Sequence, residues 1–131
     1  MTAATGAALV SMVANYSKGK SKPKQVENRI QSILKQSEQI RKRLIVLVDL
    51  DAKVYLDVVK ARGASKQVQK RALGVAAKVP REVEKLCYRL TQLTPYLVEN
   101  GNPNLISDVI IAVDLLFAAF NSARVNVEAN S

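Results

Sequence analysis

Apolar residues recur along the chain at steps of three and four, the spacing that places them on one face of an α-helix. The longest run extends from about Pro23 to Ala61, with apolar residues at Val26, Ile30, Ile33, Ile40, Leu44, Leu47, Val54 and Val58. Ser37 and Asp51 stand where this period requires an apolar residue. The pattern predicts a long helix in an antiparallel bundle, with Asp51 inside its apolar seam.

Four further segments show helical periodicity or helix end signals. They span residues of about 2–16, 65–79, 80–100 and 102–127. Ser65 and Asn102 are suitable N-caps, and Pro80 and Pro103 suit a first helical position. With neither repeats nor long linkers, residues 1–131 are predicted to form a single domain, an all-α up-and-down bundle of about five helices.

The last predicted helix is apolar on nearly every side. Its apolar residues are Leu105, Ile106, Val109, Ile110, Ile111, Val113, Leu115, Leu116, Phe117 and Phe120. A helix of this composition is buried over most of its surface. One small bundle cannot cover it fully, so we expect a second copy to do so, in a homodimer.

The composition narrows the possible chemistry. Hydrophobic residues make up 48% of the 131 residues but aromatic ones only 5%, so the core must be aliphatic, and 5 Gly and 4 Pro are too few for a sheet protein. The chain has no His and one cysteine, Cys87, which argues against a metal site and an internal disulfide. Residues 1–16 lack a basic leader and are too short to cross a bilayer, so we expect a cytoplasmic protein without a membrane anchor.

The net charge of +9 is concentrated in two stretches. Residues 1–43 and residues 60–89 each contain nine Lys or Arg against two acids. Such stretches indicate an anionic partner, such as nucleic acid, phosphate or a polycarboxylate, or else a solvated face that keeps the protein in solution. Nucleic acid is the weakest of these alternatives, because the chain has no aromatic platform and no recognisable nucleic-acid-binding motif.

Asp51 is the sharpest candidate for chemistry. A carboxylate inside an apolar seam costs several kcal/mol unless it is paired or hydrogen-bonded. It is therefore either paired across the bundle, for example with Arg71 or Lys53, or kept for a function. Cys87 is expected in the core, because no histidine is present to activate its thiol.

Two other polar groups have both a structural and a functional interpretation. Ser107 and Asp108 open the last predicted helix, as surface residues favoured by its dipole or as part of a polar pocket. The lysines of the first loop, Lys18, Lys20, Lys22 and Lys24, are either solvated or an anion contact. Gly19-Lys20-Ser21 is not a phosphate loop, because Ala14 stands where that motif requires glycine.

Several segments, in order along the chain, resemble one known family. They are Ala8–Asn15 with Gly19-Lys20, Val48–Ala52 with Tyr55, Arg71-Ala72, Val79-Pro80, Gly101–Asn104 followed by Ser107-Asp108, and Ala123–Val127. The set resembles the formiminotransferase-cyclodeaminase family, in its cyclodeaminase or methenyltetrahydrofolate cyclohydrolase part. The resemblance implies an α-helical protein, dimeric or larger, that acts on tetrahydrofolate derivatives in one-carbon metabolism without a metal or redox cofactor.

Two reactions are implied, and the sequence does not choose between them. One closes 5-formiminotetrahydrofolate to 5,10-methenyltetrahydrofolate with loss of ammonia, and the other interconverts methenyl- and 10-formyltetrahydrofolate with water. By this resemblance Asp51 is the acid/base. The expected substrate-binding residues are Asp108, Ser107, Asn102 and Asn104, with Lys18, Lys20 and Lys22 meeting the anionic tail of a polyglutamylated folate.

Two features depart from the family pattern. Its members usually open with a Gly-Gly-Gly-Ser segment, which does not precede Met1 here, and residues 62–69 are shorter than expected. Both regions are expected near the folate. The main alternative to an enzyme is therefore a catalytically degenerate member that binds folate or serves as a scaffold, and the third choice is a basic bundle that binds nucleic acid.

Overall fold

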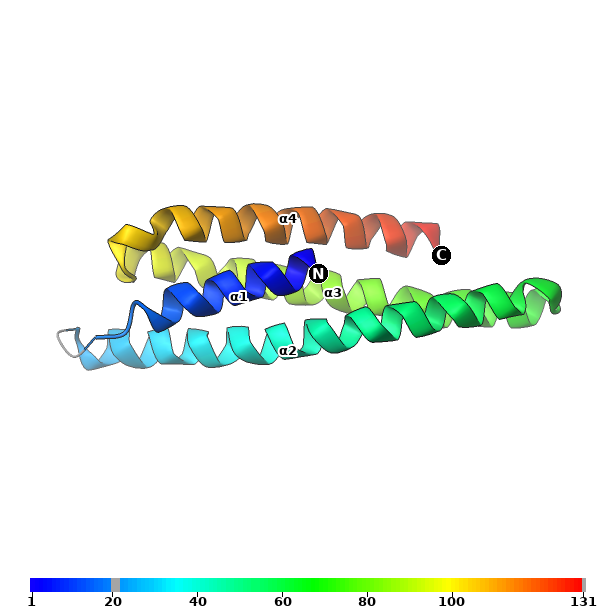
Figure 1. The fold of residues 1–131 in the computed structure, drawn as a ribbon, viewed down its shortest axis with the longest axis horizontal. Helices are drawn as coiled ribbons and strands as arrows, with labels where there is room; N and C mark the ends of the chain where they lie inside the picture. Colours follow the sequence, from blue (N-terminus) through cyan, green and yellow to red (C-terminus); the bar gives the residue numbers. More distant parts are fainter. Residues whose placement is uncertain (20–21, 131) are drawn as a thin grey trace.

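Four α-helices make up nearly all of the computed structural model, which describes residues 1–19 and 22–130 (Figure 1). They are α1 (Thr2–Asn15), α2 (Lys24–Lys60), α3 (Lys66–Asn100) and α4 (Ile106–Ala129). Short 3-10 helices lie at Ala61–Gly63 and Pro103–Leu105, and these described residues contain no strand. The prediction of an all-α bundle is confirmed.

The predicted number of helices was wrong because the expected boundary at Pro80 does not exist. One helix, α3, runs continuously through both Pro80 and Pro95. A proline inside a helix costs about 3 kcal/mol through a lost hydrogen bond and a steric clash. Burial of α3 on both sides of Pro80, at Ala77 and Val79 before it and at Cys87 beyond, offsets that cost.

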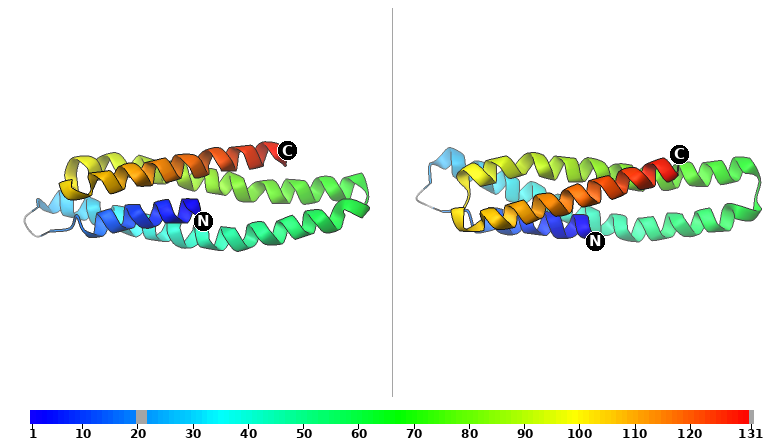
Figure 2. Two further views of the ribbon diagram at one scale, coloured as in Figure 1. Left: turned by 45° about the horizontal axis from the view of Figure 1, so that its top comes forward. Right: turned by 90° about the horizontal axis from the view of Figure 1, so that it is seen from above.

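The long α2–α3 hairpin forms the frame of the molecule, and the shorter α1 and α4 cover only part of it (Figures 1 and 2). Beyond the start of α1 and the end of α4, the two long helices continue side by side. We call this projecting part, residues 52–78, the hairpin tip. It closes through the 3-10 helix Ala61–Gly63, and Ser65 caps α3 by accepting a hydrogen bond from the Val68 backbone N–H at 3.3 Å.

The core lies in the four-helix part and is aliphatic, as predicted. Its fully buried large side chains include Val10, Val13, Ile30, Ile33, Leu47, Leu90, Leu97 and Leu116. Ser37 interrupts the α2 seam, but its hydroxyl group has hydrogen-bond partners. Its hydroxyl accepts a hydrogen bond from the Ser11 hydroxyl at 2.8 Å and donates one to the Leu34 carbonyl at 3.0 Å.

One face of α4 packs on the bundle and the other is open to solvent. Val109, Ala112 and Leu116 are buried, whereas Ile110 and Phe117 are 56% and 57% exposed. The segment Pro103–Ala129 is long and apolar enough to cross a membrane by length and composition alone, and only 22% of its most apolar window is buried. A single chain therefore leaves much of α4 uncovered, as the sequence predicts.

Candidate functional site

Asp51 is exposed, so its predicted burial in the α2 seam was wrong. The seam positions on either side, Leu47 and Val54, are buried. The first residues of α1 lie at the level of Leu44 to Asp51, and beyond them only α3 packs along α2. The hydrophobic period therefore predicts correctly that Asp51 lies on the inward face of α2. Asp51 is exposed because α1, which covers this face, begins at that level.

Asp51 borders an open cavity of about 280 Å³ that is lined by all four helices. Most of its lining is apolar and comes from Met1, Ala3, Ala4, Leu44, Leu47, Val48, Val79, Pro80, Val83, Ala118, Ala119 and Ala123. Thr2, Ser122 and Asn126 are the other polar residues of the lining. An apolar cavity with a few convergent polar groups is typical of a small-molecule site.

A second, more polar groove of about 490 Å³ continues from Asp51. Asp51 and Asn126 line both hollows, which places the two side by side. The rest of the groove is lined by Ala52, Val54, Tyr55, Val58, Arg62, Ala76 and Asn130. Asp51 therefore stands between an apolar cavity and a groove that runs along the hairpin tip.

Neither suggested partner neutralises Asp51. Among residues 1–19 and 22–130, the ion pairs are Arg41 with Glu38 and Arg43 with Glu82, so neither Arg71 nor Lys53 forms one with this aspartate. Arg71 lines a different hollow of the hairpin tip. The Asp51 carboxylate therefore has no cationic partner among the described residues and is open to a ligand.

An ion pair joins α2 and α3 beside the cavity. The Arg43 guanidinium donates two hydrogen bonds to the Glu82 carboxylate, at 2.6 and 2.7 Å. Arg43 accordingly lowers the pKa of Glu82. Glu82 is next in the chain to Val83, which lines the cavity, so this exposed bidentate contact joins α2 and α3 beside the candidate site.

Cys87 is fully buried, as expected. Desolvation raises the pKa of its thiol to about 11, so it is protonated at neutral pH and is not a nucleophile. The described part of the chain also holds no group of three or more His, Cys, Asp or Glu side chains that could bind a metal ion. Among these residues the candidate chemistry therefore centres on the Asp51 carboxylate.

Most of the other predicted site residues lie together at the opposite end of the bundle. Asn102 accepts a hydrogen bond from the Asn104 backbone N–H at 3.0 Å, and its own N–H donates to the Ser17 hydroxyl at 2.8 Å. Lys22 donates to the Asn100 carbonyl. These contacts join the connection between α1 and α2 to that between α3 and α4.

The remaining predicted residues lie at or near the same end. Ser107 is exposed and Asp108 is partly buried in the first turn of α4. Lys18 is exposed and lines a shallow groove with Lys35 and Asn28, whereas Lys20 lies outside the described residues. Ser107 and Asp108 thus lie at the start of α4 as predicted, but they line neither of the two hollows beside Asp51.

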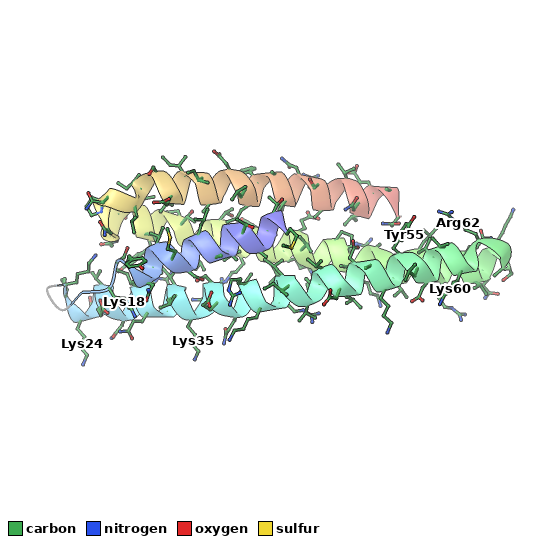
Figure 3. All side chains as sticks on the ribbon, in the orientation of Figure 1. Lys18, Lys24, Lys35, Tyr55, Lys60 and Arg62 are labelled. Carbon is green, nitrogen blue, oxygen red and sulfur yellow. The ribbon has the colours of Figure 1, made fainter. Side chains whose placement is uncertain are left out.

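The predicted site residues therefore do not form one site. From Lys24 to Asp51 α2 rises by about 40 Å at 1.5 Å per residue. Figure 3 shows Lys18 and Lys24 at one end of the molecule and Tyr55 and Arg62 at the other. A ligand held at Asp51 meets the hairpin tip and not the lysines of the first loop.

The structure adds Ser122, Asn126, Tyr55 and Arg62 to the candidate site. Tyr55 and Asn126 belong to segments that resemble the family, so a signal for them existed in the sequence. Ser122 and Arg62 had no signal of their own. Arg62 was one cation among the nine of residues 60–89.

Comparison with known proteins agrees with this architecture. The chain is 33% identical to a methenyltetrahydrofolate cyclohydrolase of Methylorubrum extorquens, in a match that covers all of this chain and 68% of that protein. The crystal structure of formiminotetrahydrofolate cyclodeaminase from Thermotoga maritima superimposes with a TM-score of 0.93 at 35% identity, over 98% of this chain.

This chain spans only part of the length of these relatives, 65% in the case of the Thermotoga maritima protein. The family profile, by contrast, is matched from the first residue to the last, over residues 1–131. The chain belongs to the formiminotransferase-cyclodeaminase family.

Proposed function

We propose that the chain acts in tetrahydrofolate one-carbon metabolism, as a 5-formiminotetrahydrofolate cyclodeaminase or a 5,10-methenyltetrahydrofolate cyclohydrolase. The observation that carries the proposal is the position of Asp51, an unpaired carboxylate at the border of an apolar cavity and a polar groove. The relatives of this chain in Methylorubrum extorquens and Thermotoga maritima are named for these two reactions.

Both reactions require one proton to be moved, and Asp51 can move it. In ring closure, N10 attacks the carbon of the protonated formimino group and loses its proton. The resulting amino group gains one proton, and its bond to that carbon breaks as ammonia leaves. In the hydrolytic reaction, water adds to the methenyl carbon and releases one proton. The bond from that carbon to N5 then breaks, and the remaining hydroxyl proton passes to N5, which leaves the formyl group on N10. A positioned carboxylate can accept and return the proton in either case. Neither scheme routes a step through a metal or a redox cofactor.

The reaction can be identified by the absorbance of the methenyl product. A cyclodeaminase is expected to generate this absorbance from 5-formiminotetrahydrofolate. A cyclohydrolase is expected to remove it by hydrolysing the methenyl compound, with water as the only co-substrate. Folate binding without turnover would favour the degenerate family member instead. Salt-sensitive binding to duplex DNA with no folate binding would favour the nucleic-acid alternative and contradict the proposal.

We also propose that the protein is a cytoplasmic homodimer in which a second copy covers the exposed face of α4. The support is the row of large apolar side chains on that face, with Ile110, Phe117 and Val125 each more than half exposed. A row of this kind marks an interaction surface. The polar residues Ser107, Asp114 and Asn121 share this exposed face, which suits a protein partner better than lipid.

Introducing charge on this face is expected to produce monomers. In Ile110→Lys/Phe117→Lys, two ammonium groups would have to be desolvated at the interface, at a cost of several kcal/mol. Sedimentation velocity at micromolar concentration is the measurement. Val46→Lys, which alters an exposed valine of α2, is the control and should stay dimeric. A monomeric parent chain would contradict the proposed dimer.

A further inference from the structure

One face of α2, continued by the 3-10 helix Ala61–Gly63, forms a wall of the polar groove. Asp51, Tyr55, Val58 and Arg62 follow one another at steps of four, three and four, and all line it. Figure 3 shows the side chains of Tyr55 and Arg62 on the same side of the hairpin, with Lys60 on the opposite side. The groove thus runs from Asp51 to Arg62.

Arg62 is an exposed arginine whose backbone, but not its guanidinium, is held by a hydrogen bond. Its guanidinium has no hydrogen bond or ion pair with any described residue. Its backbone is fixed, because the Gln69 amide donates to the carbonyls of Arg62 and Ala64, both at 3.0 Å. Residues 60–71 contain no Asp or Glu.

The distance between the two charged ends suits an elongated ligand. Arg62 is eleven positions after Asp51, which corresponds to about 16 Å at 1.5 Å per residue. The groove between them offers a phenol from Tyr55 and amides from Asn126 and Asn130. A molecule with its ring system in the apolar cavity would extend its other end along these polar groups.

We infer that the groove from Asp51 to Arg62 is a subsite for the carboxylate-bearing tail of the ligand, and that Arg62 binds a carboxylate of that tail. An arginine is suited to this role, because its planar fork can donate two parallel hydrogen bonds to one carboxylate. The inference rests on the proposed function, in which the tail is the polyglutamate chain of the folate. It places the tail at the hairpin tip, about 40–57 Å from the Lys18–Lys24 loop at 1.5 Å per residue.

The test compares the affinity of tetrahydrofolate mono- and pentaglutamate, by calorimetric titration, in Arg62→Gln and in Lys60→Gln. Both changes remove one positive charge from the same turn of the hairpin tip, but only Arg62 faces the groove. Arg62→Gln is expected to reduce the preference for the pentaglutamate by roughly two- to fivefold, as for one exposed ion pair. Lys60→Gln should retain that preference, and added salt should weaken it in the parent chain.

Each contrary result overturns a different statement. An unchanged preference in Arg62→Gln, or an equal loss in Lys60→Gln, would overturn the role of Arg62. Loss of the preference in Lys18→Gln with retention in Arg62→Gln would move the tail to the first loop. Failure of the parent chain to bind either folate would overturn the proposed function, and this inference with it. Circular dichroism of the variants shows whether the helical fold survives.

Discussion

Asp51→Asn is expected to lower turnover of the folate substrate by about a hundredfold or more, the usual contribution of a positioned general acid or base. Asparagine keeps the shape of the side chain and some of its hydrogen bonds, but it cannot carry a proton. Since Asp51 is exposed and has no ion pair among the described residues, the fold should be unaffected, with stability unchanged within about 0.5 kcal/mol. The measurement is the change in methenyl absorbance at saturating substrate.

Asp49→Asn is the matched control for this experiment. Asp49 is an exposed aspartate of the same helix, two residues away, and it lines neither hollow beside Asp51. Its substitution removes the same charge but should leave turnover unchanged. Full activity in Asp51→Asn would exclude Asp51 as the acid/base. An equal loss in both variants would attribute the effect to the local field and not to proton transfer.

The different outcomes for Ser37 and Asp51 show how far the hydrophobic period could predict the site. Both residues interrupt the same seam, yet Ser37 is fully buried and Asp51 is exposed. The period of one helix reports which face turns inward, because side chains seven residues apart share a face. It carries no information on where a neighbouring helix begins. The burial of Asp51 depends on the start of α1, which only the packed structure reveals.

The helix boundaries show a similar division between local and tertiary information. Ser65 caps α3 where predicted, because a cap depends on a few adjacent residues. Asn102 caps only the 3-10 helix Pro103–Leu105, and α4 begins at Ile106 without a side-chain cap. Pro80 carries an equally strong local signal for a helix start, but α3 continues through it. The apolar contacts of the residues on both sides outweigh the cost of the proline, so a local rule gave one helix too many.

The family resemblance identified the family, but it did not predict which of the candidate residues lie together. The ordered segments correctly indicated the family, since the whole chain matches it. The segments around Asp51 and Asn126 line one cavity, whereas Asn102 and Asn104 lie at the far end of the molecule. A sequence orders residues along the chain, and an antiparallel bundle brings the end of α4 beside the middle of α2.

Leu116→Ala is expected to destabilise the protein by about 2–5 kcal/mol, the usual cost of truncating a buried leucine. Leu116 is fully buried on α4, directly opposite Gly6 of α1. A β-carbon added at Gly6 would lie 2.9 Å from both Cγ and Cδ2 of Leu116. Gly6→Ala alone should therefore cost about 1–3 kcal/mol through overpacking, reduced by the better helix propensity of alanine.

The double variant Gly6→Ala/Leu116→Ala is expected to be more stable than the sum of the two single effects predicts, by about 0.5–3 kcal/mol. The new methyl group of Gly6→Ala enters the space that Leu116→Ala vacates, so the clash disappears and the cavity shrinks. Urea denaturation at one fixed protein concentration measures the cycle, because association would otherwise change the apparent stability. Gly74→Ala is the control, since nothing lies within 4 Å of a β-carbon there, and it should stabilise α3 by about 1 kcal/mol. Strict additivity of the two single effects would show that α1 and α4 do not pack directly against each other at this point.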